Sequence, residues 1–251
     1  MDDSQLLRYS RQIMLQDIDI AGQEKLRAAS VLIIGMGGLG CPVAMYLAAA
    51  GVGHLVISDF DRVDLSNLQR QIAHTTADIG IPKVESAKAT LQAINEHTRV
   101  ELIGDKLEGS SLEKAVDSVD IVVDASDNFS TRFAVNDCCF KTGTPLVSGA
   151  AIQFEGQVSV FDPNNPISPC YRCLYQDGDD MQLSCSENGV AAPVVGMIGT
   201  VQAMETMKLI IGLGEPLVGS LLVMDAKYME WRKLKLSRNP HCRICSERGA
   251  G

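Results

Sequence analysis

The sequence predicts an α/β fold, a mostly parallel sheet with helices on both faces that antiparallel strands continue. Two observations carry this prediction. Through residue 150, short apolar runs alternate with segments of helical periodicity, and strands separated by helices form right-handed crossovers in a parallel sheet. Beyond that residue, runs of alternating apolar and polar residues at 156–162 and 220–236 no longer follow the regular strand-helix alternation, which predicts antiparallel strands.

Periodicity, together with the residues that begin or end each segment, places the elements. Strands of the parallel part are predicted at 31–34, 54–58, 99–103, 119–125 and 145–148. Helices are predicted at 5–15, at 42–50, from Pro82 as first helical residue through Ile94, after a Ser110–Glu113 capping box, and near 131–142. The later part is predicted to hold strands at 156–162 and within 220–236, and a buried helix at 190–211 that ends at Gly212.

The segment 31–57 contains no Asp, Glu, Lys or Arg and is long enough to suggest a membrane span. Its glycines and its one proline are spaced as turns, however, which favours a strand, a turn, a buried helix, a turn and a second strand. We therefore expect no membrane span here.

Composition narrows the functional classes. The 251 residues are 46% hydrophobic and carry a net charge of −9, which favours a folded chain and argues against binding to nucleic acid or to an anionic membrane. The N-terminus Met1-Asp-Asp-Ser is acidic and lacks the pattern of an export signal, so we expect a cytoplasmic protein. Eight cysteines in a reducing compartment then serve metal binding, chemistry or packing.

A glycine-rich turn marks the junction of the first predicted strand and helix. Gly35, Gly37, Gly38 and Gly40 allow close approach of the backbone to a phosphate at a helix N-terminus, and Asp59 follows 19 residues after Gly40, at the end of the next strand. This pattern predicts a Rossmann-like nucleotide site with Asp59 on the ribose, and by itself it points first to NAD. The alternative is a turn that only packs the helix on the sheet.

Charged residues near the same sheet edge favour a triphosphate. Arg70 and Lys83 follow the second strand, and cations in this number suit ATP better than a dinucleotide. Asp124 and Asp127 end the strand at 119–125, where a carboxylate facing phosphates is a natural Mg²⁺ ligand. Alternatively, these side chains are ordinary surface charges.

Two Cys-x-x-Cys pairs predict a tetrahedral zinc site. They are Cys170 with Cys173 and Cys242 with Cys245, and the long insertion between them means that Zn²⁺ would staple a late loop to the C-terminal region. Four thiolates leave no open position, so this zinc would be structural; unmetallated cysteines are the alternative. Three further cysteines are predicted to be small core residues, namely Cys41, Cys138 and Cys139.

Several motifs together resemble the MoeB/ThiF family, the bacterial relatives of ubiquitin-activating enzymes. In order along the chain they are Arg8-Tyr-Ser-Arg11-Gln, Gly35-Met-Gly-Gly-Leu-Gly40, Asp59-Phe-Asp61, Leu65-Ser-Asn-Leu-Gln-Arg70-Gln, Pro82-Lys83 and Ser126-Asp127-Asn128. The resemblance runs from about Leu7 to Cys245. Val147-Ser-Gly-Ala-Ala-Ile and Cys170-Tyr-Arg-Cys-Leu are most similar to members that serve molybdopterin synthase.

The resemblance implies an activity and partners. ATP would adenylylate the C-terminal glycine of a ubiquitin-fold sulfur carrier, the molybdopterin synthase small subunit, in molybdenum cofactor biosynthesis, and diphosphate would leave. Alternatives are the same chemistry on the thiamin-pathway carrier, an NAD-dependent oxidoreductase, or a non-catalytic module that holds a ubiquitin-like tail. The family is typically homodimeric, so we also expect a homodimer. We expect a separate sulfur-donor protein, because the chain carries no sulfurtransferase domain.

The resemblance also implies a domain layout and residue roles. A single adenylyltransferase domain at 1–251 would hold a helical arm at 1–29, a nucleotide-binding part at 30–150, and a carrier-binding, zinc-stapled part at 151–251. Mg²⁺ would lie on Asp127, and Arg11 would reach into the neighbouring subunit's site. Cys185 is either a nucleophile that joins the carrier covalently or a thiol not needed for activation. The ATP contacts would come from Gly35, Gly37, Gly38, Gly40, Asp59, Asp61, Ser66, Asn67, Leu68, Gln69, Arg70, Lys83, Asp127 and Asn128.

Overall fold

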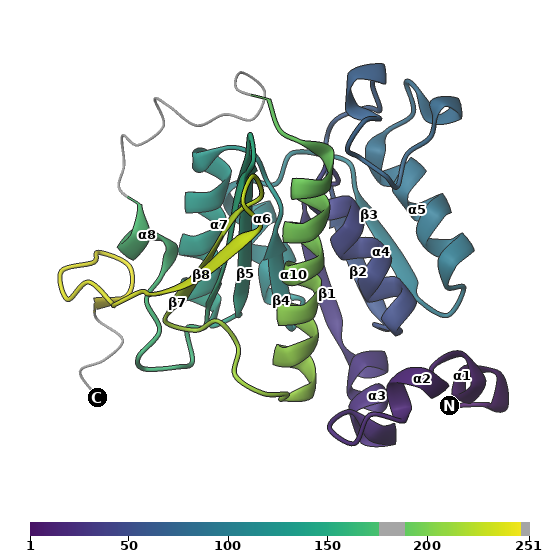
Figure 1. The fold of residues 1–251 in the computed structure, drawn as a ribbon, viewed down its shortest axis with the longest axis horizontal. Helices are drawn as coiled ribbons and strands as arrows, with labels where there is room; N and C mark the ends of the chain where they lie inside the picture. The colour runs from purple at the N-terminus through teal and green to yellow at the C-terminus, as the bar shows by residue number, and fades with distance from the viewer. Residues whose placement is uncertain (176–188, 247–251) are drawn as a thin grey trace.

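The computed structural model describes residues 1–175 and 189–246, and its eight described strands form one sheet in the order β3-β2-β1-β4-β5-β6-β7-β8 (Figure 1). Strands β1 to β5 pair with their neighbours in parallel, and β6, β7 and β8 continue the sheet with antiparallel pairs. The parallel strands are β1 (Ser30–Ile34), β2 (His54–Ser58), β3 (Arg99–Ile103), β4 (Ile121–Asp124) and β5 (Leu146–Ile152). The antiparallel strands are β6 (Glu155–Phe161), β7 (Ser220–Asp225) and β8 (Glu230–Lys235).

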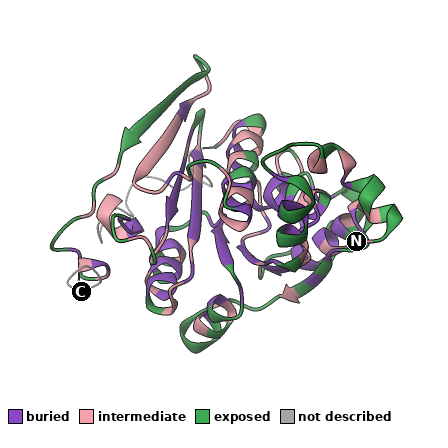
Figure 2. Cartoon of the chain, turned by 90° about the horizontal axis from the view of Figure 1, so that it is seen from below, coloured by how far each residue is buried: buried purple, intermediate pink, exposed green. Residues whose placement is uncertain are grey.

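Helices cover both faces of the sheet, which confirms the predicted fold class. One face carries α3 (Asp19–Ala28), α4 (Gly40–Ala50), α5 (Lys83–Ile94) and α10 (Ala192–Ile211), and the other carries α6 (Gly109–Asp117), α7 (Phe129–Thr142) and the short α8 (Tyr171–Leu174). The sheet separates two hydrophobic clusters, one on each face, and successive side chains of β1 point to opposite faces. Val31 and Ile33 belong to the cluster under α4 and α10, and Leu32 and Ile34 belong to the cluster under α6 and α7. Strand β8 at the sheet edge is exposed along its whole length (Figure 2).

The predicted strands are confirmed within a few residues, whereas three helix boundaries were wrong. The segment 5–15 forms two short helices, α1 (Asp3–Arg8) and α2 (Ser10–Ile13), that meet at Tyr9. Pro82 has extended ψ and caps α5 instead of opening it. The capping box of α6 joins Glu108 to Ser111 and not Ser110 to Glu113, since the chain turns into the helix two residues earlier. The division of a single domain at residues 29 and 150 stays a prediction.

The segment 31–57 folds as β1, α4 and β2, as the spacing of its glycines predicted. Among the described helices, α10 alone is long and apolar enough to cross a membrane by length and composition. It packs against α4 and against strands β4, β5 and β6, and Val194, Ile198 and Ala203 are buried there. These contacts identify α10 as a core helix of the fold.

Candidate active site

The glycine turn between β1 and α4 is shaped by close contacts that only glycine permits. Gly35 has a φ of +95°, and a Cβ there would lie 2.8 Å from the Ala125 carbonyl oxygen. A Cβ on Gly40 would lie 1.8 Å from the Gly35 carbonyl oxygen. The turn can therefore fold tightly and bring the N–H groups at the start of α4 to the end of the sheet.

A pocket of about 1060 Å³, which includes space open to solvent, lies against this turn. The carboxyl ends of all four neighbouring strands contribute to its lining, because Gly35 follows β1, Asp59 follows β2, Lys106 follows β3 and Ser126 follows β4. The strand order reverses direction between β1 and β4, and ligands of open α/β sheets bind at such a switch point. Nine predicted site residues line this pocket, namely Gly35, Gly37, Gly38, Asp59, Asp61, Arg70, Lys83, Asp127 and Asn128.

Lys83 brings a buried positive charge to the pocket wall. Its Nζ lies 2.8 Å from an Asp61 carboxylate oxygen and 3.9 Å from one of Asp59, and its side chain is 7% exposed. Asp59 in turn accepts the backbone N–H groups of Met36 and Asp61, each at 2.8 Å. Since each carboxylate oxygen has a further lone pair, Asp59 can still accept a ribose hydroxyl, and this predicted role stays a prediction.

Asp127 and Asn128 lie in the loop between β4 and α7. Asp127 is exposed and lines the pocket, and Asn128 caps α7 by accepting the Thr131 backbone N–H at 2.9 Å. One carboxylate combined with substrate phosphates and water is the usual ligand set of Mg²⁺, so Asp127 fits the predicted metal role.

Other predicted site residues lie away from the pocket lining. Ser66, Asn67, Leu68 and Gln69 belong to η1 (Leu65–Asn67) and the turn after it, while Gly40 acts through packing. Arg11 is exposed on α2 and does not line the pocket of its own chain. Cys185 lies outside the described residues. The roles predicted for these residues stay predictions.

Some residues of the pocket were missed from the sequence. Lys106 lies three residues after the last residue of β3, so its place near a carboxyl strand end was a usable signal. Arg132 in the first turn of α7 is buried and donates from two nitrogens to the Ser126 carbonyl oxygen, at 3.3 and 2.8 Å. Asp124, a predicted Mg²⁺ candidate, does not line the pocket: its carboxylate is buried and accepts the Ser126 backbone N–H and hydroxyl, and its pKa is raised above its usual range because burial disfavours the charged form. No sequence spacing pointed to the buried position of Arg132.

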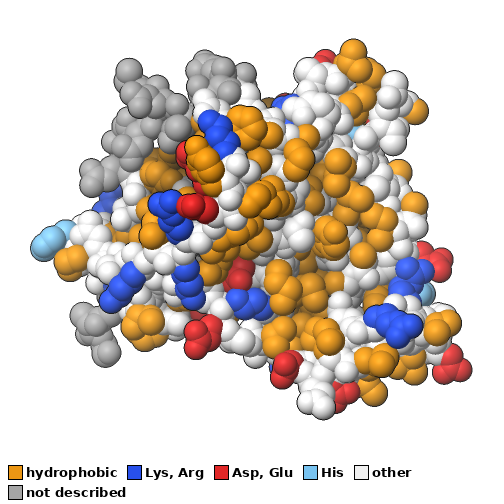
Figure 3. Space-filling view, viewed as in Figure 1, with side chains coloured by type: hydrophobic (Ala, Val, Ile, Leu, Met, Phe, Trp, Pro, Cys, Tyr) orange, Lys and Arg blue, Asp and Glu red, His pale blue; other side chains and the backbone are white. Residues whose placement is uncertain are grey.

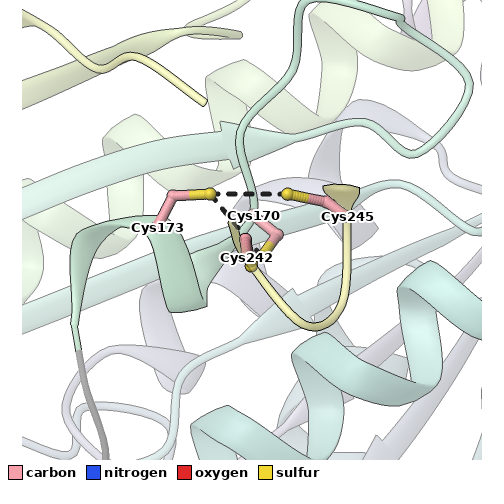
Figure 4. A group of neighbouring side chains, drawn as sticks. All are labelled: Cys170, Cys173, Cys242 and Cys245. Carbon is pink, nitrogen blue, oxygen red and sulfur yellow. Dashed lines mark hydrogen bonds between the residues drawn. The ribbon is translucent and has the colours of Figure 1, made fainter. Parts of the chain in front are cut away.

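The four predicted zinc ligands lie together (Figure 4). Their sulfur atoms all lie within 4.8 Å of one another, with Cys170–Cys242 and Cys173–Cys245 at 3.4 Å and Cys170–Cys173 at 4.0 Å. Tetrahedral Zn–S bonds of about 2.3 Å would separate the sulfurs by about 3.8 Å, so the cluster fits one zinc ion. The Asn239 backbone N–H donates to the Cys173 sulfur at 3.3 Å, and such bonds support a bound thiolate.

The three remaining described cysteines are buried, as predicted. Burial raises the pKa of Cys41 to about 12 and that of Cys138 to about 11, so both stay protonated at neutral pH. Cys41, Cys138 and Cys139 are therefore core residues and poor nucleophiles.

Comparison with known proteins decides the family. The model of the ThiF family matches residues 9–244, nearly the whole chain. The chain belongs to the ThiF family.

Curated relatives of this ThiF-family protein match along almost their full length. The molybdopterin-synthase adenylyltransferase of Escherichia coli is 46% identical over 247 residues, which cover 98% of this chain and 99% of the relative. That of Haemophilus influenzae is 48% identical and covers 93% and 96%. The sulfur carrier protein ThiS adenylyltransferase of Escherichia coli is 45% identical and covers 98% and 97%.

Solved structures share the fold of this ThiF-family chain. Escherichia coli MccB with ATP has a TM-score of 0.83 and 27% identity, covering 95% of this chain and 74% of that one. PaaA has a TM-score of 0.81 and 25% identity, covering 95% and 76%. The predicted family and fold class are thereby confirmed.

Proposed function

We propose that this protein is an adenylyltransferase that activates the C-terminal glycine of a ubiquitin-fold sulfur carrier with ATP, in molybdenum cofactor biosynthesis. The pocket carries the proposal, because the glycine turn, four Lys and Arg side chains and three aspartates line it at the ends of four strands. Near-full-length similarity to molybdopterin-synthase adenylyltransferases supports the choice of substrate.

The reaction needs positioning and charge neutralisation more than a protein nucleophile. A carboxylate oxygen of the carrier glycine attacks the α-phosphorus of ATP, a P–O bond forms, and the bond to the bridging oxygen breaks. Diphosphate leaves with that electron pair, and the carrier becomes an acyl-adenylate. Lys83 and Arg70 offset charge on the phosphates, while backbone N–H groups at the start of α4 bind them.

Two metals have separate places in this proposal. Asp127 would hold Mg²⁺, which supplies further charge neutralisation at the phosphates. The four cysteines would hold Zn²⁺ as a structural ion that ties Cys242 and Cys245 to α8. Closed four-thiolate coordination leaves zinc no part in the chemistry.

A second hollow of about 720 Å³, which also includes open space, offers a path for the carrier tail. Its lining includes Phe129, Ala150, Gly156 and Tyr175, so it is largely apolar along β5 and β6. It adjoins the nucleotide pocket, because Ala151 and Arg132 line both. A thin Gly-Gly tail entering here would bring its carboxylate to the α-phosphate.

A homodimer is supported by an apolar surface. Figure 3 shows hydrophobic side chains gathered over the region of α10 and α4. Large apolar side chains exposed on the arm and on these helices are Leu7, Met14, Leu15, Ile20, Tyr46 and Met204. Exposed apolar patches of this kind mark association surfaces. The family resemblance implies that in such a dimer Arg11 acts at the partner's site, and we propose that the dimer acts in the cytoplasm with a separate sulfur donor.

ATP–diphosphate exchange tests the function. The purified protein should catalyse exchange that depends on Mg²⁺ and on a carrier ending in Gly-Gly. Comparing the molybdopterin and thiamin carriers decides between the two pathways, since a ThiS adenylyltransferase is also a close relative. NAD binding without exchange would overturn the proposal in favour of an oxidoreductase.

A further inference from the structure

His74 is a buried histidine behind the nucleotide pocket that none of the roles above uses. It is 6% exposed, and it does not line the pocket. Its Nε2 lies 3.0 Å from the Met36 carbonyl oxygen, and its Nδ1 lies 2.8 Å from the Ser86 hydroxyl. Burial lowers the pKa of His74, which favours the neutral ring at physiological pH.

These partners determine which ring nitrogen carries the proton. A carbonyl oxygen only accepts, so the Nε2–H of His74 must donate to Met36. Nδ1 then accepts from the Ser86 hydroxyl. The Cys41 thiol also donates to the Met36 carbonyl, at 3.4 Å, so two side chains hold this one oxygen.

The Met36 carbonyl belongs to the peptide unit that joins Met36 to Gly37. This peptide is trans, so its N–H, which is that of Gly37, points opposite to its C=O. With the carbonyl held by His74 on the buried side, the Gly37 N–H is directed away from His74. Gly37 lines the nucleotide pocket, where an N–H donor can meet a phosphate.

The same histidine connects the turn with α5. Ser86 lies three residues after Lys83 in the first turns of that helix. On the other side, the Met36 N–H donates to Asp59, Asp59 accepts the Asp61 N–H, and Asp61 pairs with Lys83. Hydrogen bonds therefore connect Ser86, His74, Met36, Asp59, Asp61 and Lys83 in this order, and helix α5 closes the ring because it carries both Lys83 and Ser86.

We propose that His74 is a positioning residue for adenylylation, which holds the Met36–Gly37 peptide so that the Gly37 N–H meets the ATP phosphates, and which couples this turn to Lys83 through Ser86. The proposal rests on ATP occupying the pocket. His74 touches neither substrate, so its effect is on ATP binding and not on the carrier.

The test compares two substitutions of His74. His74→Leu keeps a similar volume and removes both hydrogen bonds, whereas His74→Gln keeps a donor near the position of Nε2. His74→Leu should raise the Kd and KM for ATP about 3- to 10-fold, the size of one net hydrogen bond, with the KM for the carrier unchanged. His74→Gln should restore most of the ATP affinity.

A matched control separates positioning from lost stability. Val116→Ala removes buried volume in the core cluster on the opposite face of the sheet, so it should lower Tm without changing the Kd for ATP. Unchanged ATP affinity in folded His74→Leu, or no recovery in folded His74→Gln, would overturn the inference while wild-type exchange still supported the function. Absence of wild-type exchange would instead overturn the function.

A second variant covers the case in which His74→Leu does not fold. Ser86→Ala removes the donor to Nδ1 and leaves the bond between His74 and Met36 in place. It should weaken ATP binding about 2- to 3-fold, because the turn loses its link to α5. ATP affinity equal to that of the wild type would overturn the coupling of the turn to Lys83.

Discussion

The substitution Lys83→Met separates the role of Lys83 in ATP binding from its role in stability. Methionine keeps an unbranched apolar stem of nearly the same length and removes only the charged head. In the structure that head is 2.8 Å from Asp61 and 3.9 Å from Asp59, and the lysine side chain is 7% exposed. The change therefore deletes a buried cation while the packing of its stem remains.

The contacts predict a small loss of stability and a large loss of ATP affinity. The Asp61 side chain is 54% exposed, so solvent screens its pair with Lys83, and such a pair contributes about 1 kcal/mol or less. Asp59 keeps two backbone N–H donors when the lysine is removed. By contrast, a charged hydrogen bond to a phosphate contributes about 1.5–3 kcal/mol, so the Kd for ATP should rise about 10- to 150-fold.

Calorimetric titration with ATP and thermal unfolding measure the two effects on one preparation. Lys208→Met is a matched control, because Lys208 pairs at 2.7 Å with the buried Glu205 on α10, away from the pocket lining. The control should lower Tm and leave the Kd for ATP unchanged. An unchanged Kd in folded Lys83→Met would refute the placing of Lys83 at the phosphates, and equal losses of affinity in both variants would attribute the effect to stability.

Four further predictions test the metals, the dimer and the buried acid. Asp127→Ala should abolish adenylate formation by exchange assay while Tm stays within about 2 °C of the wild type, because Asp127 is exposed. Mixing Arg11→Ala with Lys83→Ala subunits should restore part of the exchange activity if Arg11 acts across a dimer; no recovery would contradict that arrangement. Chelation of zinc should lower Tm by about 5–10 °C and expose the segment around Cys242 to protease, with the α/β core still folded by circular dichroism. The raised pKa of Asp124 means that the folded state binds more protons than the unfolded state above the usual carboxyl pKa, so stability should fall as pH rises through this window, and urea titrations of Asp124→Asn should show a flatter profile.

Local chemistry explains why so much of the sheet could be predicted. The strands predicted at 54–58 and 99–103 match β2 and β3 to the residue, because each apolar or alternating segment is bounded by a turn or by polar residues. The glycine turn was equally readable, since Gly35 and Gly40 occupy positions where any Cβ would collide with the backbone. In both cases the residues that determine the structure are neighbours in the chain.

Features that depend on distant partners could not be predicted. The sequence placed Asp59 on a ribose, but gave no sign that its carboxylate already accepts two backbone N–H groups from separate loops. Arg132 gave no signal either, because its hydrogen bonds to the Ser126 carbonyl oxygen form only once the loop between β4 and α7 has folded. His74 behaves in the same way, since Met36 and Ser86 meet only in the folded protein.

Helix α7 connects the cysteine cluster with the nucleotide pocket. Its N-cap residue Asn128 and Arg132 in its first turn line the nucleotide pocket. One to two turns further on, Asn136 accepts the Tyr171 backbone N–H at 2.7 Å, and Asp137 forms a bidentate pair with Arg172 at 2.6 and 2.7 Å. Both partners belong to α8, which also supplies Cys173, so the cysteine cluster and the pocket are joined through α7. Because a bound zinc would fix α8, it would also fix the end of α7 on which the carrier tail and ATP would meet.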